Sequence, residues 1–181
     1  HNYKIMAVDA ALNPLLVAGI KPDWVFTVDS DLIAGAFFKD IPSTNGVTLI
    51  AGVTTHQHVF ELWKNEVVLY MPYMMDVIDI FLPGRRMTGD LQKTNVMNYI
   101  AAKFPKIPKL LVNFNVSSTA LNLIAACNFK KIVLVGIDFC FWHNRYYCKN
   151  VKMPEVEIET ADQLRSKFGP AIIEVEHEGQ K

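Results

Sequence analysis

The chain has 181 residues, 51% of them hydrophobic, and its 18 basic residues balance 18 acidic ones. This length and composition predict one globular domain that is large enough to form a core without disulfides or structural metal ions. The formal net charge of zero provides no overall field for nucleic acid or for an anionic membrane surface, so neither is an expected partner.

The three cysteines, Cys127, Cys140 and Cys148, are odd in number and lack CxxC spacing. They predict neither a disulfide framework nor a zinc site, and they fit a reducing, cytoplasmic compartment. No apolar run reaches the roughly twenty residues of a membrane span, and Asp9 interrupts the first apolar run too early for a signal peptide. Because the first residue is His1 and not methionine, we expect a tag remnant or a piece of a longer protein.

Short β-branched runs alternate with helical patterns along most of the chain. The predicted strands are residues 3–8, 24–28, 47–51, 66–70 and 131–135, and the predicted helices are residues 10–18, 55–63, 91–102 and 117–127. Strands that are apolar throughout, such as residues 132–135, are typical of a parallel sheet that is covered on both faces. The pattern therefore predicts an α/β fold, a Rossmann-like and doubly wound three-layer sandwich with a mostly parallel sheet.

We expect residues 1–150 to form this α/β unit and residues 151–181 to add a helix and a strand to the same domain. Thr54 and Gln57 have capping-box spacing, which supports a helix start in the first unit. Residues 71–89 form a long connection rich in proline and glycine, which is more typical of a binding or lid segment. Within it, Arg85 and Arg86 are a candidate clamp for a phosphate or carboxylate, and a solvated loop is the alternative.

Acidic residues follow three of the predicted strands. Asp9 follows the first, Asp29 and Asp31 follow the second, and Asp138 follows the last. Because the carboxyl ends of parallel strands line a shared crevice, we expect these acids to converge on one pocket. Such a pocket suits a hydroxyl-rich or phosphorylated ligand, with or without a divalent metal. For Asp9 the alternative is a cap on the following helix.

Two further segments carry candidate site residues. Asn115, Ser117 and Ser118 precede or begin a predicted helix, where amide donors and hydroxyls can hold a phosphate, and ordinary helix caps are the alternative. His143 lies beyond Asp138 in an aromatic segment that could stack on a base and hold a phosphate, or form a partly buried flap. His143 itself is a candidate general base, and an ordinary surface or core histidine is the alternative.

His56 and His58 are two residues apart on a predicted helix and so point to different faces, which argues against a metal pair.

Three blocks of the sequence resemble the family of motility accessory factors, whose central domain is shared with archaeal 6-hydroxymethylpterin diphosphokinases. The blocks are residues 8–12, residues 19–29 and residues 134–139, in that order and spacing. The last block is also similar to one in bacterial sialyltransferases that use CMP-activated sugars. The resemblance implies a Rossmann-like domain that helps to transfer a nonulosonic acid from CMP onto flagellin.

The sequence also departs from these relatives. The pterin-kinase branch carries Asp-x-Asp for magnesium directly after the position of Thr27, where this chain has Val28, which cannot ligate a metal ion. The family normally begins with a strand and a Gly-x-Gly-Pro-Ser loop, and this sequence starts after them. Phe114 also intrudes where the family tends to have small residues.

The resemblance therefore favours a glycosyltransferase domain of the motility accessory type, acting on a CMP-linked donor and a Ser or Thr hydroxyl of flagellin. In this interpretation Asp9 and Asp29 orient ribose or sugar hydroxyls, and Ser117 and Ser118 hold the phosphate. One alternative is a pyrophosphokinase for a pterin-like alcohol, with ATP and magnesium. The other is a non-catalytic Rossmann-like domain that binds a partner such as flagellin.

Overall fold

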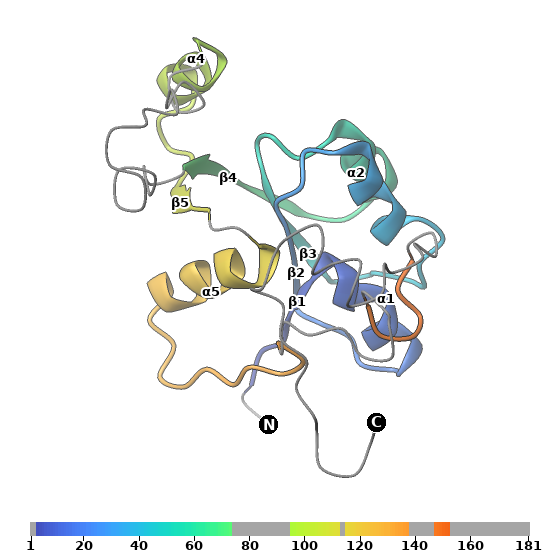
Figure 1. The fold of residues 1–181 in the computed structure, drawn as a ribbon. Helices are drawn as coiled ribbons and strands as arrows, with labels where there is room; N and C mark the ends of the chain where they lie inside the picture. The colour runs from blue at the N-terminus through green and yellow to red at the C-terminus, as the bar shows by residue number, and fades with distance from the viewer. Residues whose placement is uncertain (1–2, 74–94, 113–114, 138–146, 153–181) are drawn as a thin grey trace, which may run out of the picture.

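The computed structural model describes residues 3–73, 95–112, 115–137 and 147–152. Its centre is a five-stranded sheet in the order β1-β2-β3-β4-β5, in which every neighbouring pair is parallel (Figure 1). The strands are β1 (Met6–Val8), β2 (Trp24–Thr27), β3 (Thr48–Gly52), β4 (Val67–Tyr73) and β5 (Lys109–Leu111). An all-parallel sheet with helical connections confirms the predicted α/β, Rossmann-like class.

Helices cover both faces of this sheet. The helical elements are α1 (Asp9–Val17), the 3-10 helix η1 (Leu32–Phe38), α2 (Gln57–Leu62), α4 (Asn95–Lys103) and α5 (Val116–Ala126). In Figure 1, α1 and α2 lie on one side of the sheet and α5 lies on the other. The three layers therefore have the arrangement that the apolar strands predicted.

Successive residues of the central strands point into two separate cores. Val25 and Leu49 are fully buried in the core formed with α1, η1 and α2. Their neighbours Phe26 and Ile50 lie in the second core, which includes Ala120 of α5. Because side chains alternate across a strand, a strand covered on both faces must be apolar at consecutive positions.

The chain winds in one direction through the sheet and then returns. Strands β1 to β5 follow one another in sequence order, and η1 contacts both α1 and α2 on one face. After β5, α5 runs back along the opposite face and contacts β1 and β2 as well as β5. A doubly wound sheet also requires a reversal of the strand order, which the described strands do not show, so this part of the predicted fold stays a prediction.

Most of the predicted elements are present with shifted ends, and two elements were not predicted. Strand β5 has only three residues beside Pro108, too few to show a period of two. Helix η1 has the sequence LIAGAFF, whose continuous apolar run lacks the polar positions that reveal an amphipathic helix.

The predicted capping box is wrong, because α2 begins at Gln57 and not at residue 55. Its N-cap is His56, whose Nδ1 accepts a hydrogen bond of 3.2 Å from the backbone N–H of His58. Thr54 is an exposed residue that precedes the helix. The loop after β3 is therefore longer than predicted.

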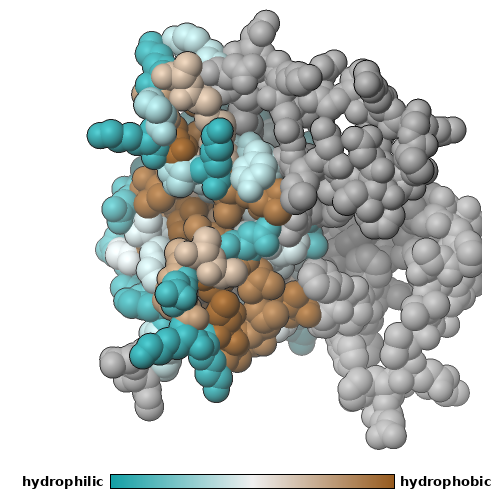
Figure 2. All heavy atoms as spheres, turned by 90° about the vertical axis from the view of Figure 1, so that its left-hand side faces the viewer, coloured by the Kyte–Doolittle hydropathy of each residue, from teal (hydrophilic) through white to brown (hydrophobic). Residues whose placement is uncertain are grey.

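The predicted strand at residues 131–135 is also wrong. These residues form neither strand nor helix, and Val133 and Val135 are 70% and 85% exposed. A strand needs a neighbouring edge for its hydrogen bonds, and among the described residues β1 pairs with β2 alone. Hydrophobic side chains are consequently exposed on the side of the molecule that Figure 2 shows.

The remaining predicted elements fall largely outside the described residues. Residues 74–94 and 153–181 belong to this group, so the division between residues 1–150 and 151–181 stays a prediction. No helix within the described ranges is long and apolar enough to cross a bilayer.

The same substitution should change the free energy of unfolding much more in the buried strand β2 than in the exposed segment 131–135. We expect Val25→Thr to lower the free energy of unfolding by about 1–3 kcal/mol, because it buries a hydroxyl inside a packed core. The same change at Val135 should shift that free energy by less than about 0.5 kcal/mol. Urea denaturation of both variants tests this, and equal losses would show that Val135 is buried in solution.

Candidate functional site

The side chain of Asp9 is held inside the protein where β1 passes into α1. It is 2% exposed, and its two carboxylate oxygens have separate donors. Oδ2 accepts a hydrogen bond of 2.8 Å from the Thr27 hydroxyl, and Oδ1 accepts one of 2.8 Å from the backbone N–H of Ala10. In this geometry Asp9 connects β1 to the end of β2 and does not face solvent.

Tyr70 extends this hydrogen-bonded group to β4. Its hydroxyl donates a hydrogen bond of 3.0 Å to the backbone carbonyl of Thr27, and its ring stacks on Phe26 at 5.3 Å between centroids. Thr27 therefore contacts Asp9 through its side chain and Tyr70 through its main chain. The carboxyl end of β2 is fixed from both sides.

Burial and mutual repulsion control the charges in this group. Burial raises the pKa of Asp9 to about 6, the hydrogen bonds from Thr27 and Ala10 oppose that rise, and the charge of Asp29 adds to it. The pKa of Tyr70 is raised, first by burial and then by the charges of Asp9 and Asp29. The cluster favours neutral forms, so an added negative charge would be unfavourable there.

Asp29, two residues beyond β2, is the carboxylate that a ligand can reach. Its side chain is exposed, and none of the described residues donates a hydrogen bond to its carboxylate. Partial desolvation raises its pKa, and the nearby charge of Asp31 raises it further. A perturbed and unpaired carboxylate at the carboxyl end of a parallel strand is a candidate binding group.

Asp31 has a partly structural role. Its carboxylate accepts a hydrogen bond of 3.0 Å from the backbone N–H of Ile33 and so caps η1. One oxygen of Asp31 is used in this bond, which leaves the other available beside Asp29.

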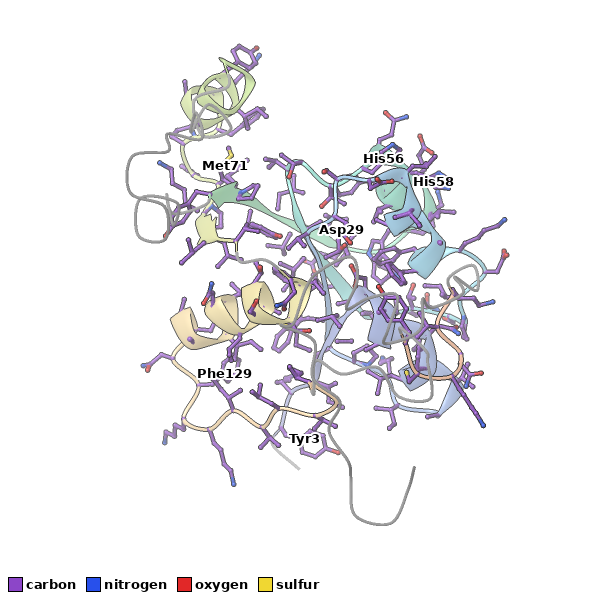
Figure 3. All side chains as sticks on the ribbon, in the orientation of Figure 1. Tyr3, Asp29, His56, His58, Met71 and Phe129 are labelled. Atoms are coloured by element: carbon purple, nitrogen blue, oxygen red, sulfur yellow. The ribbon has the colours of Figure 1, made fainter. Side chains whose placement is uncertain are left out.

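The loop after β3 brings further polar residues to Asp29. The backbone N–H of His56 donates a hydrogen bond of 3.3 Å to the carbonyl of Asp29, and Figure 3 shows the two residues at the same end of the sheet. Thr54 and the Tyr70 hydroxyl both lie close to Gly52, since a Cβ on that glycine would be 3.5 Å from an oxygen of each.

Sequence reasoning missed this loop. A pattern that could have revealed it is present in the sequence. Polar residues follow β3 at Thr54, Thr55 and His56, just as Asp29 follows β2.

His58 lies in the first turn of α2, whereas His56 precedes the helix as its N-cap and is not on it as predicted. Its Nδ1 lies 3.1 Å from Oε2 of Glu61, and its ring packs against Gly35 of η1. A Cβ at Gly35 would lie 2.4 Å from Cδ2 of His58, so any larger residue there would displace the ring. Within the described part of the chain, no group of three or more His, Cys, Asp or Glu residues could hold a metal ion.

At the start of α5 the capping interpretation is confirmed for Asn115. Its Oδ1 accepts a hydrogen bond of 2.8 Å from the backbone N–H of Ser118, and its carbonyl accepts one of 3.2 Å from the Ser118 hydroxyl. Ser117 is partly buried in the first turn. A phosphate contact by Ser117 or Ser118 stays a prediction.

Four candidate residues lie outside the described residues: Asp138, His143, Arg85 and Arg86. Their proposed parts in a clamp, a loop and a proton transfer stay predictions. The structure brings Asp9, Asp29 and Asp31 to one end of the sheet, as expected, and the convergence of Asp138 on them stays a prediction.

One comparison with known proteins gives a match. A family model described as 6-hydroxymethylpterin diphosphokinase MptE-like matches residues 1–144. No curated protein and no solved structure matches the chain.

The buried Asp9 predicts a pH-dependent stability. Its pKa is about 6 when folded and 3.8 without the fold, so the folded state binds the proton more tightly. The resulting stabilisation is complete below about pH 4 and is lost as the pH rises through about 6. We expect it to amount to about 2–3 kcal/mol, and Asp9→Asn should remove this part of the pH dependence.

Urea denaturation between pH 4 and pH 7 gives the measurement, and the difference between the two proteins isolates Asp9. Asp23, whose pKa is lowered by its hydrogen bond with Lys4, contributes in the opposite direction and is present in both proteins. Identical pH profiles for the wild type and Asp9→Asn would contradict the prediction.

Proposed function

The chain belongs to the 6-hydroxymethylpterin diphosphokinase MptE-like family, and from this premise we propose that it is a transferase domain that binds a nucleotide-activated substrate at the carboxyl end of its sheet. The observation that carries the proposal is Asp29. It is an exposed carboxylate without a hydrogen-bond donor among the described residues, placed where open α/β sheets bind ligands.

The specific reaction we propose is glycosyl transfer of the motility accessory type. The donor would be a CMP-linked nonulosonic acid and the acceptor a Ser or Thr hydroxyl of flagellin. Two features support transfer without a metal at β2. Val28 stands where a magnesium ligand would be needed, and both carboxylate oxygens of Asp9 already have donors.

In this reaction the acceptor oxygen forms a bond to the anomeric carbon while the bond from that carbon to the CMP phosphate oxygen breaks. CMP leaves with the electron pair, and the proton of the acceptor hydroxyl passes to a base, for which His143 is the candidate. Asp29 would accept hydrogen bonds from ribose or sugar hydroxyls and so orient the donor. Asp9 would act indirectly, by holding Thr27 and the end of β2 in place.

The other assignments in this proposal concern the phosphate. Ser117 and Ser118 at the start of α5 would hold it, and Arg85 and Arg86 would close over it. Asp138 would support the loop that carries His143.

A pyrophosphokinase is the second candidate, favoured by one observation. The carboxylates of Asp29 and Asp31 are close enough for the charge of Asp31 to raise the pKa of Asp29. Magnesium is commonly held by one or two carboxylates together with substrate phosphates, and these two residues would hold it here. The ion would neutralise charge on the phosphates during transfer from ATP to a pterin-like alcohol.

Removal of the Asp29 charge tests nucleotide binding directly. We expect Asp29→Asn to weaken the binding of CMP by about 10- to 100-fold, because hydrogen bonds to a charged acceptor contribute more than neutral ones. Isothermal titration calorimetry gives the affinity. The melting temperature should not fall, because the Asp29 side chain accepts no hydrogen bond from the described residues.

Asp40→Asn is the matched control for this experiment. Asp40 is an exposed aspartate after η1, and its φ of 49° is one that asparagine also adopts readily. CMP affinity should be unchanged in this variant. If both variants bind CMP like the wild type, Asp29 is not a ligand contact, and a non-catalytic binding domain becomes the better interpretation.

Chelation separates the two candidate reactions. A glycosyl transfer supported by Asp29 alone should keep its rate in EDTA, because no carboxylate–metal contact is needed. A pyrophosphokinase should release AMP from ATP only with magnesium, and should lose at least about 100-fold in rate on chelation. Measurement of AMP release and of CMP release, each with and without EDTA, decides between them.

A further inference from the structure

The hydrogen bond at the start of α2 defines the protonation of His56. Its Nδ1 accepts from the backbone N–H of His58 at 3.2 Å, so that nitrogen must carry a lone pair. A neutral imidazole with a lone pair on Nδ1 has its proton on Nε2. His56 therefore has an N–H donor on the far side of its ring from the helix that it caps.

The loop that carries this donor is joined to the main chain of Asp29, the candidate binding residue. The backbone N–H of His56 donates to the carbonyl of Asp29 at 3.3 Å, which joins the loop after β3 to the loop after β2 (Figure 3). Asp29 has an exposed acceptor group and His56 a partly buried donor group. The loops that carry this acceptor and this donor are thus joined through their main chains.

The same loop contains an unsatisfied polar group. Thr55 is 6% exposed, and among the described residues its hydroxyl has no hydrogen-bond partner. Buried hydroxyls normally have partners, because leaving one unpaired costs about 1–3 kcal/mol. Thr55 therefore has an unused hydrogen-bonding group among the described residues of this loop.

We propose that His56 and Asp29 together bind the two adjacent hydroxyls of the ligand's ribose, with Asp29 accepting from one hydroxyl and Nε2–H of His56 donating to the other. This assignment rests on the proposed function, in which the ligand is a nucleotide. A diol suits the pair because each of its hydroxyls both donates and accepts, and because it is uncharged. A phosphate in this position would be repelled by the charges of Asp29 and Asp31.

Two substitutions of His56 separate its helix-capping role from its donor role. In His56→Asn, the side-chain carbonyl takes the place of Nδ1 and keeps the cap, since asparagine is a good N-cap residue, but nothing replaces Nε2–H. In His56→Gln, the longer side chain carries an amide N–H donor to about the position of Nε2 and loses the capping geometry. The melting temperature reports the cap, and ligand selectivity reports the donor.

The ligands for this test are CMP and its 2′-deoxy and 3′-deoxy counterparts, titrated into the full chain by calorimetry. We expect the wild type to bind CMP about tenfold or more tightly than at least one deoxy analogue, because the missing hydroxyl leaves a group of the protein unpaired. His56→Asn should lose this preference at an unchanged melting temperature. His56→Gln should keep most of the preference and melt at a lower temperature.

The outcomes distinguish this inference from the proposed function. If the wild type binds CMP and both deoxy analogues equally, or if His56→Asn keeps the full preference, the assignment of His56 is overturned while nucleotide binding stands. If neither CMP nor AMP binds the wild type at millimolar concentration, the proposed function fails, and the ribose contact fails with it. A preference kept in His56→Asn and lost in His56→Gln would show that His56 acts only through the cap, which also overturns the assignment.

Discussion

A carboxylate buried at the end of a strand must be satisfied by hydrogen bonds, and Asp9 meets that requirement in a way that ties the end of β1 to the end of β2. Thr27 and Ala10 supply the donors, and Thr27 is in turn bound through its carbonyl to the hydroxyl of Tyr70. One polar group thereby joins the carboxyl ends of β1 and β2 to the middle of β4. An unsatisfied ion at this depth would cost several kcal/mol, so the positions of these residues are strongly coupled.

This buried group explains why the loop after β2 is suited to binding. The carbonyl of Thr27 is held by Tyr70, and the carbonyl of Asp29 is held by the backbone of His56, so the chain between them has little freedom. The backbone at Asp29 therefore keeps its position before any ligand arrives, which lowers the entropic cost of binding. The negative charges nearby favour uncharged hydroxyl donors at Asp29, and a phosphate would have to be bound elsewhere, such as at the start of α5.

Family membership and site geometry support different parts of the functional argument. The match over residues 1–144 establishes the MptE-like family, and the parallel sheet establishes where a ligand is expected. Neither one chooses between sugar transfer and pyrophosphate transfer. The residues that bear on this choice are local: Val28 disfavours a metal at the end of β2, whereas the neighbouring carboxylates of Asp29 and Asp31 leave one possible.

The sequence by itself determined the fold class and the acids after β1 and β2, because apolar periodicity and strand-end polar residues are local properties of the chain. Only the tertiary structure decided what each group does. It showed that Asp9 is buried and Asp29 is exposed, and that His56 lies beside Asp29. It also left residues 131–135 without a sheet partner, although their composition is typical of a buried strand. Burial, strand pairing and contacts between separate loops depend on residues far apart in the chain, and a pattern of neighbouring residues does not contain them.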